Sequence, residues 1–269
     1  GFSGQAAILA AELTRRGIIG STQVIEGEFG LFRNYVRTDT PDWDIIVGGL
    51  GERFPLLDTH GFKVWPACGY TRATNAAIQE LRNEFALDPR AVEAIVVSGG
   101  TGGTQLLSEP LDLKRRPKLA IDGKFSIPFT SAVMMVKGDV RLRDYTDAGL
   151  NDPAVLAMAD KVSYRAGSAE TLPVGGYSSL SRPTVEIRMR DGKTYSRKVD
   201  GVPGDPAHPV SDEVLAAKFR DCVSFSARPV PAADVERAIA MIADLKNLRD
   251  RSEEHTSELQ SRFGISYAV

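Results

Sequence analysis

The sequence has 269 residues, of which 42% are hydrophobic, and its 33 Lys and Arg residues against 35 Asp and Glu residues give a net charge of −2. This length and composition suit a globular protein of one large or two smaller domains and exclude a fibrous or disordered chain. The sequence contains no block of like charges of the kind that binds nucleic acid, and no apolar stretch of the roughly 18 residues that cross a bilayer. We therefore expect neither nucleic acid nor a membrane as a partner. Two cysteines, Cys68 and Cys222, are too few for a disulfide framework and are typical of the cytoplasm.

The two ends of the sequence are unlike the rest. The segment Arg251–Ser261 resembles the in-frame translation of a DNA sequencing adapter, and residues 262–269 continue no periodic pattern. We therefore interpret 251–269 as an artefact tail and leave it out of the functional argument. The chain lacks an initiator Met and opens directly on a helical pattern, so we expect it to begin inside a longer protein.

The first predicted element is a small-residue helix over residues 3–16, ended by Gly17. Two glycines among aromatic residues at Gly27–Gly30 predict a turn docked on a core, and a helix-poor stretch is expected after it. Proline at position 66 predicts an extended segment over 62–66, because the residue before a proline avoids helical geometry.

The central and C-terminal parts have clearer periodic patterns. Their predicted elements are an amphipathic helix over 70–85, a buried strand over 91–98, a buried helix over 125–136, a short helix starting at Asp152-Pro153, a β-hairpin over 183–199 turning at Asp191-Gly192, and two helices after the proline-rich linker 203–209. Ser211 is expected to cap the first of these two helices. The second is expected to bury the apolar residues Val235, Ile239, Ile242 and Leu245.

The order of elements, helical, then mixed, then helical, predicts an α+β fold. We interpret it as an α+β domain over 58–200 inserted in a helical domain, to which residues 1–57 and 201–250 belong. Most of that helical domain would lie outside this sequence.

Two segments suggest anion binding only weakly. The glycine run Gly99–Thr104 follows a predicted strand, but it has neither a dinucleotide-binding nor a phosphate-loop spacing, and Gln105–Pro110 does not predict a helix. A surface loop is the expected structure. The basic cluster Lys114–Lys118 is typical of a solvated loop, with anion binding as the alternative.

The residues around Trp65-Pro66 allow two interpretations. Lys63, Cys68 and Arg72 follow one another at spacings of five and four, with His60 just upstream. The first interpretation is structural, a strand with an exposed lysine and a buried thiol. In the second, an extended segment that leads directly into a helix gathers cations and backbone donors into a trap for carboxylates.

Several segments in the same order resemble the MmgE/PrpD family, whose members include 2-methylcitrate dehydratases and cis-aconitate decarboxylases. The resemblance covers nearly all of residues 1–250, and its strength comes from the number and order of the segments. These segments are Gly1–Ala11, Glu26–Phe32, Lys63–Thr71, Asp122–Phe129, Asp144–Asp147, Asn151–Pro153, Arg190–Gly192 and Leu215–Arg220.

The resemblance implies a large helical domain with a smaller α+β lid and an active site that binds di- and tricarboxylates. Lys63 matches a lysine of the family's pocket, and Cys68 stands where members have histidine or cysteine, so we assign both as catalytic candidates. Lys63, Arg72 and Lys124 are candidate substrate-binding residues. Arg72 replaces a common histidine and Phe129 a common tyrosine, and these departures disfavour a decarboxylase pocket in particular. Neither the family nor the spacing of potential ligands implies a metal or another cofactor.

The resemblance implies a lyase that dehydrates or decarboxylates a carboxylate such as 2-methylcitrate. An isomerase or epimerase acting on a related dicarboxylate is a close alternative, because it also removes a proton beside a carboxylate. A different alternative is a non-catalytic fragment of such an enzyme, since the family's acidic and histidine active-site residues precede Gly1. The resemblance also implies a homodimer in the full-length form.

Overall fold

The computed structural model describes residues 1–36, 40–59, 61–99, 102–166, 182–199 and 201–247. Two compact units divide the chain, one over Gly1–Phe54 and the other beginning at Pro55; each is described by itself. Among the described residues, no helix is long and apolar enough to cross a membrane. The expected artefact tail, 251–269, lies outside the described residues.

The first unit consists of helix α1 (Phe2–Arg15), a π-helical turn (Phe32–Val36) and helix α2 (Trp43–Val47). Helix α1 agrees with the predicted one, and Gly17 after it has a φ of 92°. The expected helix-poor stretch is partly wrong, because the Asp42 side chain accepts a hydrogen bond from the Ile45 amide and caps α2. Gly30 is buried, but Phe29 beside it is 87% exposed. The predicted docking therefore does not bury that aromatic ring.

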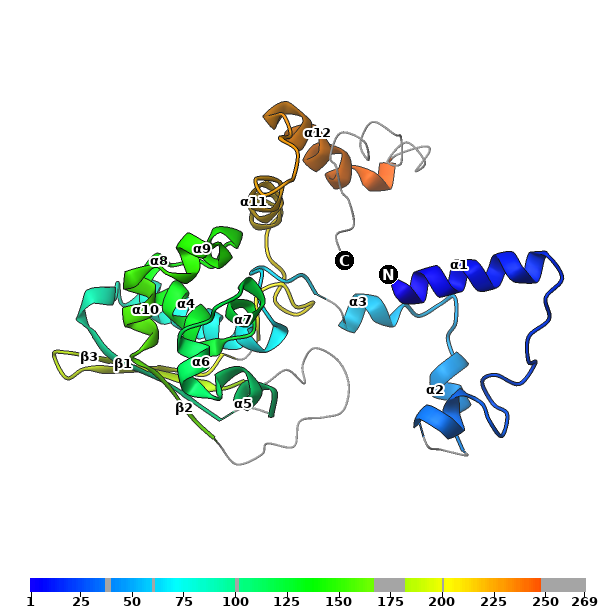
Figure 1. The fold of residues 1–269 in the computed structure, drawn as a ribbon, viewed down its shortest axis with the longest axis horizontal. Coiled ribbons are helices and arrows are strands. Elements are labelled where there is room, and N and C mark those ends of the chain that lie inside the picture. Colours follow the sequence, from blue (N-terminus) through cyan, green and yellow to red (C-terminus); the bar gives the residue numbers. More distant parts are fainter. Residues whose placement is uncertain (37–39, 60, 100–101, 167–181, 200, 248–269) are drawn as a thin grey trace. The chain divides into compact units, whose positions relative to one another are not determined.

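The second unit is built on a four-stranded mixed sheet in the order β2-β1-β3-β4 (Figure 1). Strand β1 (Val92–Ser98) pairs in parallel with β2 (Val162–Arg165) and antiparallel with β3 (Thr184–Met189), which forms the predicted hairpin with β4 (Thr194–Arg197). Side chains at alternate positions of β3 are buried, as expected for a strand with one face toward the core. The mixture of helices and a sheet confirms the α+β fold class.

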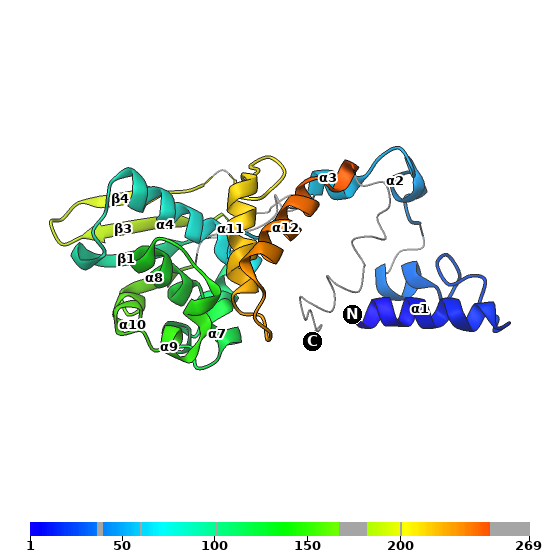
Figure 2. The same cartoon turned by 90° about the horizontal axis from the view of Figure 1, so that it is seen from above.

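Helices cover one face of this sheet, as Figures 1 and 2 show. Helix α4 (Arg72–Glu84) confirms the predicted amphipathic helix and α8 (Ile127–Lys137) the buried one, with Pro128 in its first turn. Helix α10 (Pro153–Ala159) begins after Asp152, as predicted. The core includes fully buried residues of α4, α8 and the sheet: Ile78, Leu81, Val92, Ile95, Val97, Ile127, Phe129, Met134, Met135 and Ile187.

Several elements of this unit were not predicted. They are strand β2 and helices α3 (Pro55–Thr59), α5 (Gly102–Ser108), α6 (Leu111–Arg115), α7 (Ala120–Lys124) and α9 (Asp147–Leu150). Helix α5 shows that the expectation of no helix over 105–110 is wrong. The sequence did not predict this helix because it begins with two glycines and lacks the usual start signals. Residues 100 and 101 of the glycine run lie outside the described residues.

The basic cluster Lys114–Lys118 is only partly a solvated loop, because Lys114 and Arg115 end helix α6 while Arg116 and Lys118 are exposed. Lys114 donates to the Phe125 carbonyl, Arg115 to the Val162 carbonyl, and Arg116 pairs with Asp160. These three cations connect the end of α6 to the segment before α8, and to β2 and the residues before it, and anion binding by the cluster stays a prediction.

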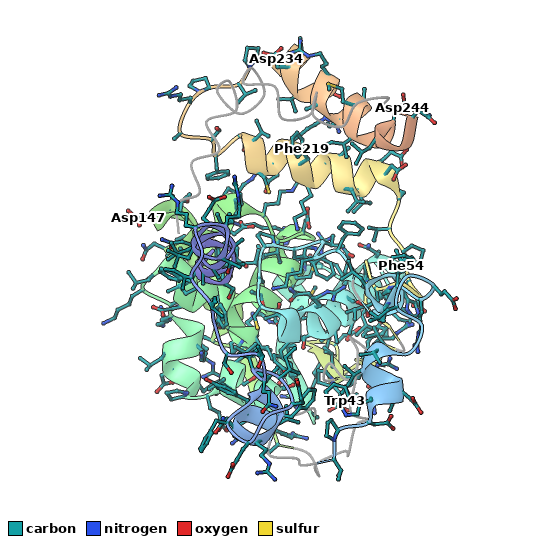
Figure 3. All side chains as sticks on the ribbon, turned by 90° about the vertical axis from the view of Figure 1, so that its right-hand side faces the viewer. Trp43, Phe54, Asp147, Phe219, Asp234 and Asp244 are labelled. Carbon is teal, nitrogen blue, oxygen red and sulfur yellow. The ribbon has the colours of Figure 1, made fainter. Side chains whose placement is uncertain are left out.

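Helices α11 (Asp212–Val223) and α12 (Ala232–Ala243) follow the proline-rich linker. Both were predicted, and Ser211 is the N-cap residue of α11, although its side chain donates or accepts no capping bond. On α12, Val235 is buried but Ile242 is 60% exposed, so its predicted burial is wrong. Figure 3 shows the side chains of the two helices, with Phe219 labelled on α11.

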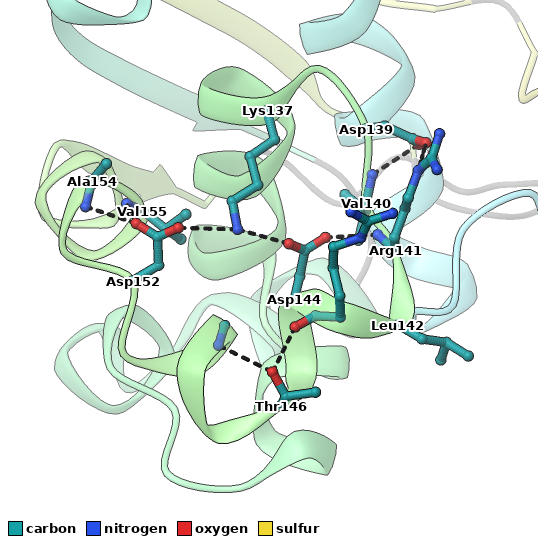
Figure 4. Close-up of polar contacts among 12 residues, drawn as sticks. Lys137, Asp139, Val140, Arg141, Leu142, Asp144, Thr146, Asp152, Ala154 and Val155 are labelled. Atoms are coloured by element: carbon teal, nitrogen blue, oxygen red, sulfur yellow. Dashed lines mark hydrogen bonds and ion pairs between the residues drawn. The ribbon is translucent and has the colours of Figure 1, made fainter. Parts of the chain in front are cut away.

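An ion-pair network joins the end of α8 to the starts of the next helices (Figure 4). The Lys137 ammonium lies 2.8 Å from Asp144 and 3.1 Å from Asp152. Asp144, 1% exposed, also accepts a 2.7 Å bond from the Arg141 amide. Burial alone would raise the pKa of Asp152, but hydrogen bonds from Lys137 and from the Val155 and Ala154 amides outweigh it and leave this pKa below its usual value.

Replacing Lys137 tests this network. We expect Lys137→Met to lower the free energy of unfolding by about 2–3 kcal/mol, because it leaves the Asp144 carboxylate buried without its counter-ion. Urea denaturation at pH 7 measures the change. The matched control is Lys193→Met, which removes a lysine whose pair with Asp191 is exposed and should change the free energy by less than about 0.5 kcal/mol.

The same network predicts how stability depends on pH. Because the pKa of Asp152 is lowered in the folded state, its contribution is present above the unfolded value near 3.9 and is lost as the pH falls through the folded value. Below that range, the difference in stability between wild type and Lys137→Met should be smaller, because the contribution of Asp152 is lost. A difference that stays constant down to pH 2 would contradict the network's electrostatic role.

Candidate functional site

The predicted site segment, 62–66, has no strand hydrogen bonds but is held by backbone contacts. The Phe62 amide donates a 2.8 Å bond to the Gly204 carbonyl. Gly204 has a φ of 91°, and a Cβ atom at Gly61 or Gly204 would collide with the opposite backbone. Only glycine at both positions allows the two segments to approach so closely. This close crossing of the 61–62 and 203–205 segments fixes the backbone position of Lys63.

Arg72, at the first turn of α4, secures the same crossing from inside. It is 1% exposed, and its guanidinium lies 2.8 Å from the Asp205 carboxylate and donates a 2.7 Å bond to the Pro203 carbonyl. A longer contact of 3.4 Å reaches the Phe62 carbonyl. Substrate binding by Arg72 stays a prediction, but these contacts favour a structural role in joining α4 to the 203–205 turn.

Lys63 lines a cavity of about 410 Å³ between its own segment and helices α11 and α12. One face of α11 forms much of the wall, because positions three, four and seven apart lie together on a helix. Lys63 itself is exposed. The residues around it are mostly apolar: Phe62, Asp212, Leu215, Ala216, Lys218, Phe219, Cys222, Ile239, Ile242 and Ala243.

Lys218 of α11 is the second cation of this cavity. Its ammonium donates a hydrogen bond to the Lys63 backbone carbonyl. Burial lowers the pKa of Lys218, and the positive charges of Lys63 and Arg72 lower it further, while Cys222 acts in the opposite direction. Positive charge is therefore concentrated where the two segments meet.

A second cavity of about 340 Å³ lies on the other side of Lys218. Its polar groups are already engaged: the Trp65 indole donates a 3.0 Å bond to Asp139, which also pairs with Arg141 at 2.8 Å. Asp221 of α11 accepts a 3.1 Å bond from the Leu142 amide. This wall attaches α11 to the rest of the unit and leaves the Lys63 cavity as the better candidate for a ligand.

Cys68 and Lys124 lie together but line neither cavity. The Cys68 amide donates a 2.9 Å bond to the Lys124 carbonyl, and the half-buried thiol packs against the core. The Lys124 ammonium lies 5.5 Å from the centre of the Tyr145 ring, and Phe129 beside that ring is fully buried. The proposed roles of Cys68 and Lys124 stay predictions. His60, noted upstream of the site, lies outside the described residues.

Sequence reasoning missed Lys218 and Asp205. Lys218 belongs to a segment used for the family resemblance, and its helix presents Leu215, Phe219 and Cys222 on one face. That spacing predicts an apolar stripe, but it does not say which segment faces it. Asp205 stands in a proline-rich linker, where nothing predicts a buried ion pair.

The comparison with family models gives one match, to the MmgE/PrpD C-terminal domain over residues 65–247. This match spans more than half of the chain. The chain belongs to the MmgE/PrpD family. The match includes Cys68, Arg72, Lys124 and Lys218, and it begins two residues after Lys63. A comparison with curated proteins found no match. Membership suggests an enzyme of the lyase type.

Replacing Arg72 distinguishes a structural role from substrate binding. We expect Arg72→Met to lower the free energy of unfolding by about 3 kcal/mol, because it leaves Asp205 without its counter-ion at a site that is largely closed to water. Urea denaturation measures this loss. The double variant Arg72→Met/Asp205→Leu is the control and should be less destabilised, since it removes both charges. An Arg72→Met protein of unchanged stability but weakened citrate binding would instead establish substrate binding.

Proposed function

We propose that this protein is a lyase of the MmgE/PrpD type that dehydrates a hydroxy-tricarboxylate such as 2-methylcitrate, with Lys63 binding a substrate carboxylate. Two observations support this proposal. The family match covers 65–247, and Lys63 opens into a cavity of about 410 Å³ with a largely apolar wall. The single observation that carries it is the place of Lys63 at this cavity.

The chemistry explains the need for a fixed cation. Removing a proton beside a carboxylate, before water leaves, builds negative charge on an enolate-like centre next to existing anions. An ammonium group held against an apolar wall interacts with such charge more strongly than one in bulk water. Lys63 can supply this charge to a substrate carboxylate and to the developing anion.

A direct test is the dehydration of 2-methylcitrate, followed by the ultraviolet absorbance of the unsaturated product. Because the family resemblance implies a helical domain that lies mostly outside this sequence, both the chain and the product of a gene extended on either side are assayed. In the active form, we expect Lys63→Met to lower kcat/KM by about 10²–10³. The matched control is Lys118→Met, an exposed lysine away from the cavity, which should keep full activity.

Three outcomes would contradict the proposal. Absence of turnover in both forms would exclude 2-methylcitrate dehydration. Turnover that is unaffected by Lys63→Met would exclude the role of Lys63. An isomerised or epimerised product without loss of water would replace the lyase with the alternative reaction class.

A further inference from the structure

We propose that Lys218 is a second anion-binding residue of the Lys63 cavity, so that one bound ligand carries two carboxylates that contact the two lysines. This inference rests on the proposed function and deepens it, because it assigns a residue of α11 to the recognition of the substrate.

The position of Lys218 supports this role. It lines the cavity together with Lys63, and its ammonium reaches the Lys63 backbone carbonyl. An ammonium group has three hydrogen-bond donors. The bond to the carbonyl uses one of them, which leaves donors for a ligand in the space that the two side chains share.

The charges around the cavity favour an anion. Among the residues that the structure describes, neither Lys63 nor Lys218 forms an ion pair. Arg72 adds a third positive charge nearby, although Asp205 partners it. Asp212 is the only carboxylate among the described wall residues, and it is exposed at the first turn of α11. Two cations brought together without a partner repel each other, so an anion bound between them gains from both.

The rest of the wall indicates what else the ligand contains. Leu215, Phe219, Ile239 and Ile242 surround the lysines with apolar surface. A ligand with two carboxylates on a short hydrocarbon backbone matches this arrangement, because its chain can cover the apolar wall while its charged ends meet the ammonium groups. Inorganic phosphate or acetate offers only part of this match.

Binding of citrate to the full chain, measured by isothermal titration calorimetry at pH 7.5 and low salt, tests the assignment without requiring turnover. Tricarballylate and acetate are the comparison ligands. We expect Lys218→Gln, which keeps a neutral donor for the Lys63 carbonyl, to weaken citrate binding about ten- to a hundredfold. Lys218→Arg, which keeps the charge, should bind citrate within a few-fold of wild type. The control Lys118→Met should bind citrate as wild type does. Acetate binding should be weak in all of them.

A pH series provides a second readout. The titratable and charged groups around Lys218 are Lys63, Arg72, Asp212 and Cys222, together with those of the second cavity, Asp139, Arg141 and Asp221. All of them are unchanged in Lys218→Arg. Because the pKa of Lys218 lies below that of an ordinary lysine, its charge is lost at lower pH than usual. We therefore expect that, as the pH is raised, citrate affinity begins to fall at a lower pH in wild type than in Lys218→Arg.

The outcomes separate this inference from the proposed function. If Lys63→Met abolishes citrate binding while Lys218→Gln binds like wild type, Lys218 acts at most by holding the Lys63 carbonyl; the inference is then wrong and the proposed function stands. Identical pH profiles for wild type and Lys218→Arg would also overturn it. If wild type binds neither citrate nor tricarballylate, this inference fails, whereas the proposed function is decided by the turnover of 2-methylcitrate.

Discussion

The ion pair between the buried Arg72 guanidinium and Asp205 is the interaction on which the geometry of the site depends. A guanidinium stays charged in proteins, so it is stable in the interior only where acceptors surround it. Asp205 and the Pro203 carbonyl supply those acceptors and tie the 203–205 turn to the start of α4. The linker that leads into α11 is thereby fixed against the Phe62–Lys63 segment, and the Lys63 cavity follows from this connection.

Two features of the cavity make the positive charge of Lys218 unfavourable. Burial against the apolar wall removes water from the Lys218 ammonium, and the positive charges of Lys63 and Arg72 make its own charge less favourable. Both effects lower the pKa of Lys218. A carboxylate ligand would relieve both, because it replaces the lost solvation and neutralises the charge. The proposed binding of carboxylates here would suit a reaction that develops negative charge beside existing carboxylates.

Much of the fold could be predicted from local patterns. The 3.6-residue period of α4 and α8, the alternation along β3 and the Asp152-Pro153 start of α10 are each set by neighbouring residues, and all were found. Strand β2 was missed because four residues carry too short a pattern. The burial of Ile242 was predicted wrongly because periodicity identifies an apolar face but not whether another segment covers it.

For the candidate site, too, the sequence identified individual residues but not how they are arranged in space. Lys63, Cys68, Arg72 and Lys124 were singled out as a set, but the structure separates them: Lys63 lines the cavity, Arg72 is buried behind it, and Cys68 and Lys124 lie against the core. Sequence spacing could not resolve this, because 131 residues separate Arg72 from Pro203 and 155 separate Lys63 from Lys218. Contacts over such distances are set by tertiary structure, and they bring Lys218 to the site.

A crystal structure of the protein with citrate tests the central claim most directly. The account predicts citrate in the cavity between the Lys63 segment and α11, with one carboxylate within about 2.7–3.2 Å of the Lys63 ammonium, a second within the same distance of Lys218, and the hydrocarbon backbone against the apolar wall. Citrate bound elsewhere, with both ammonium groups turned toward solvent, would contradict it.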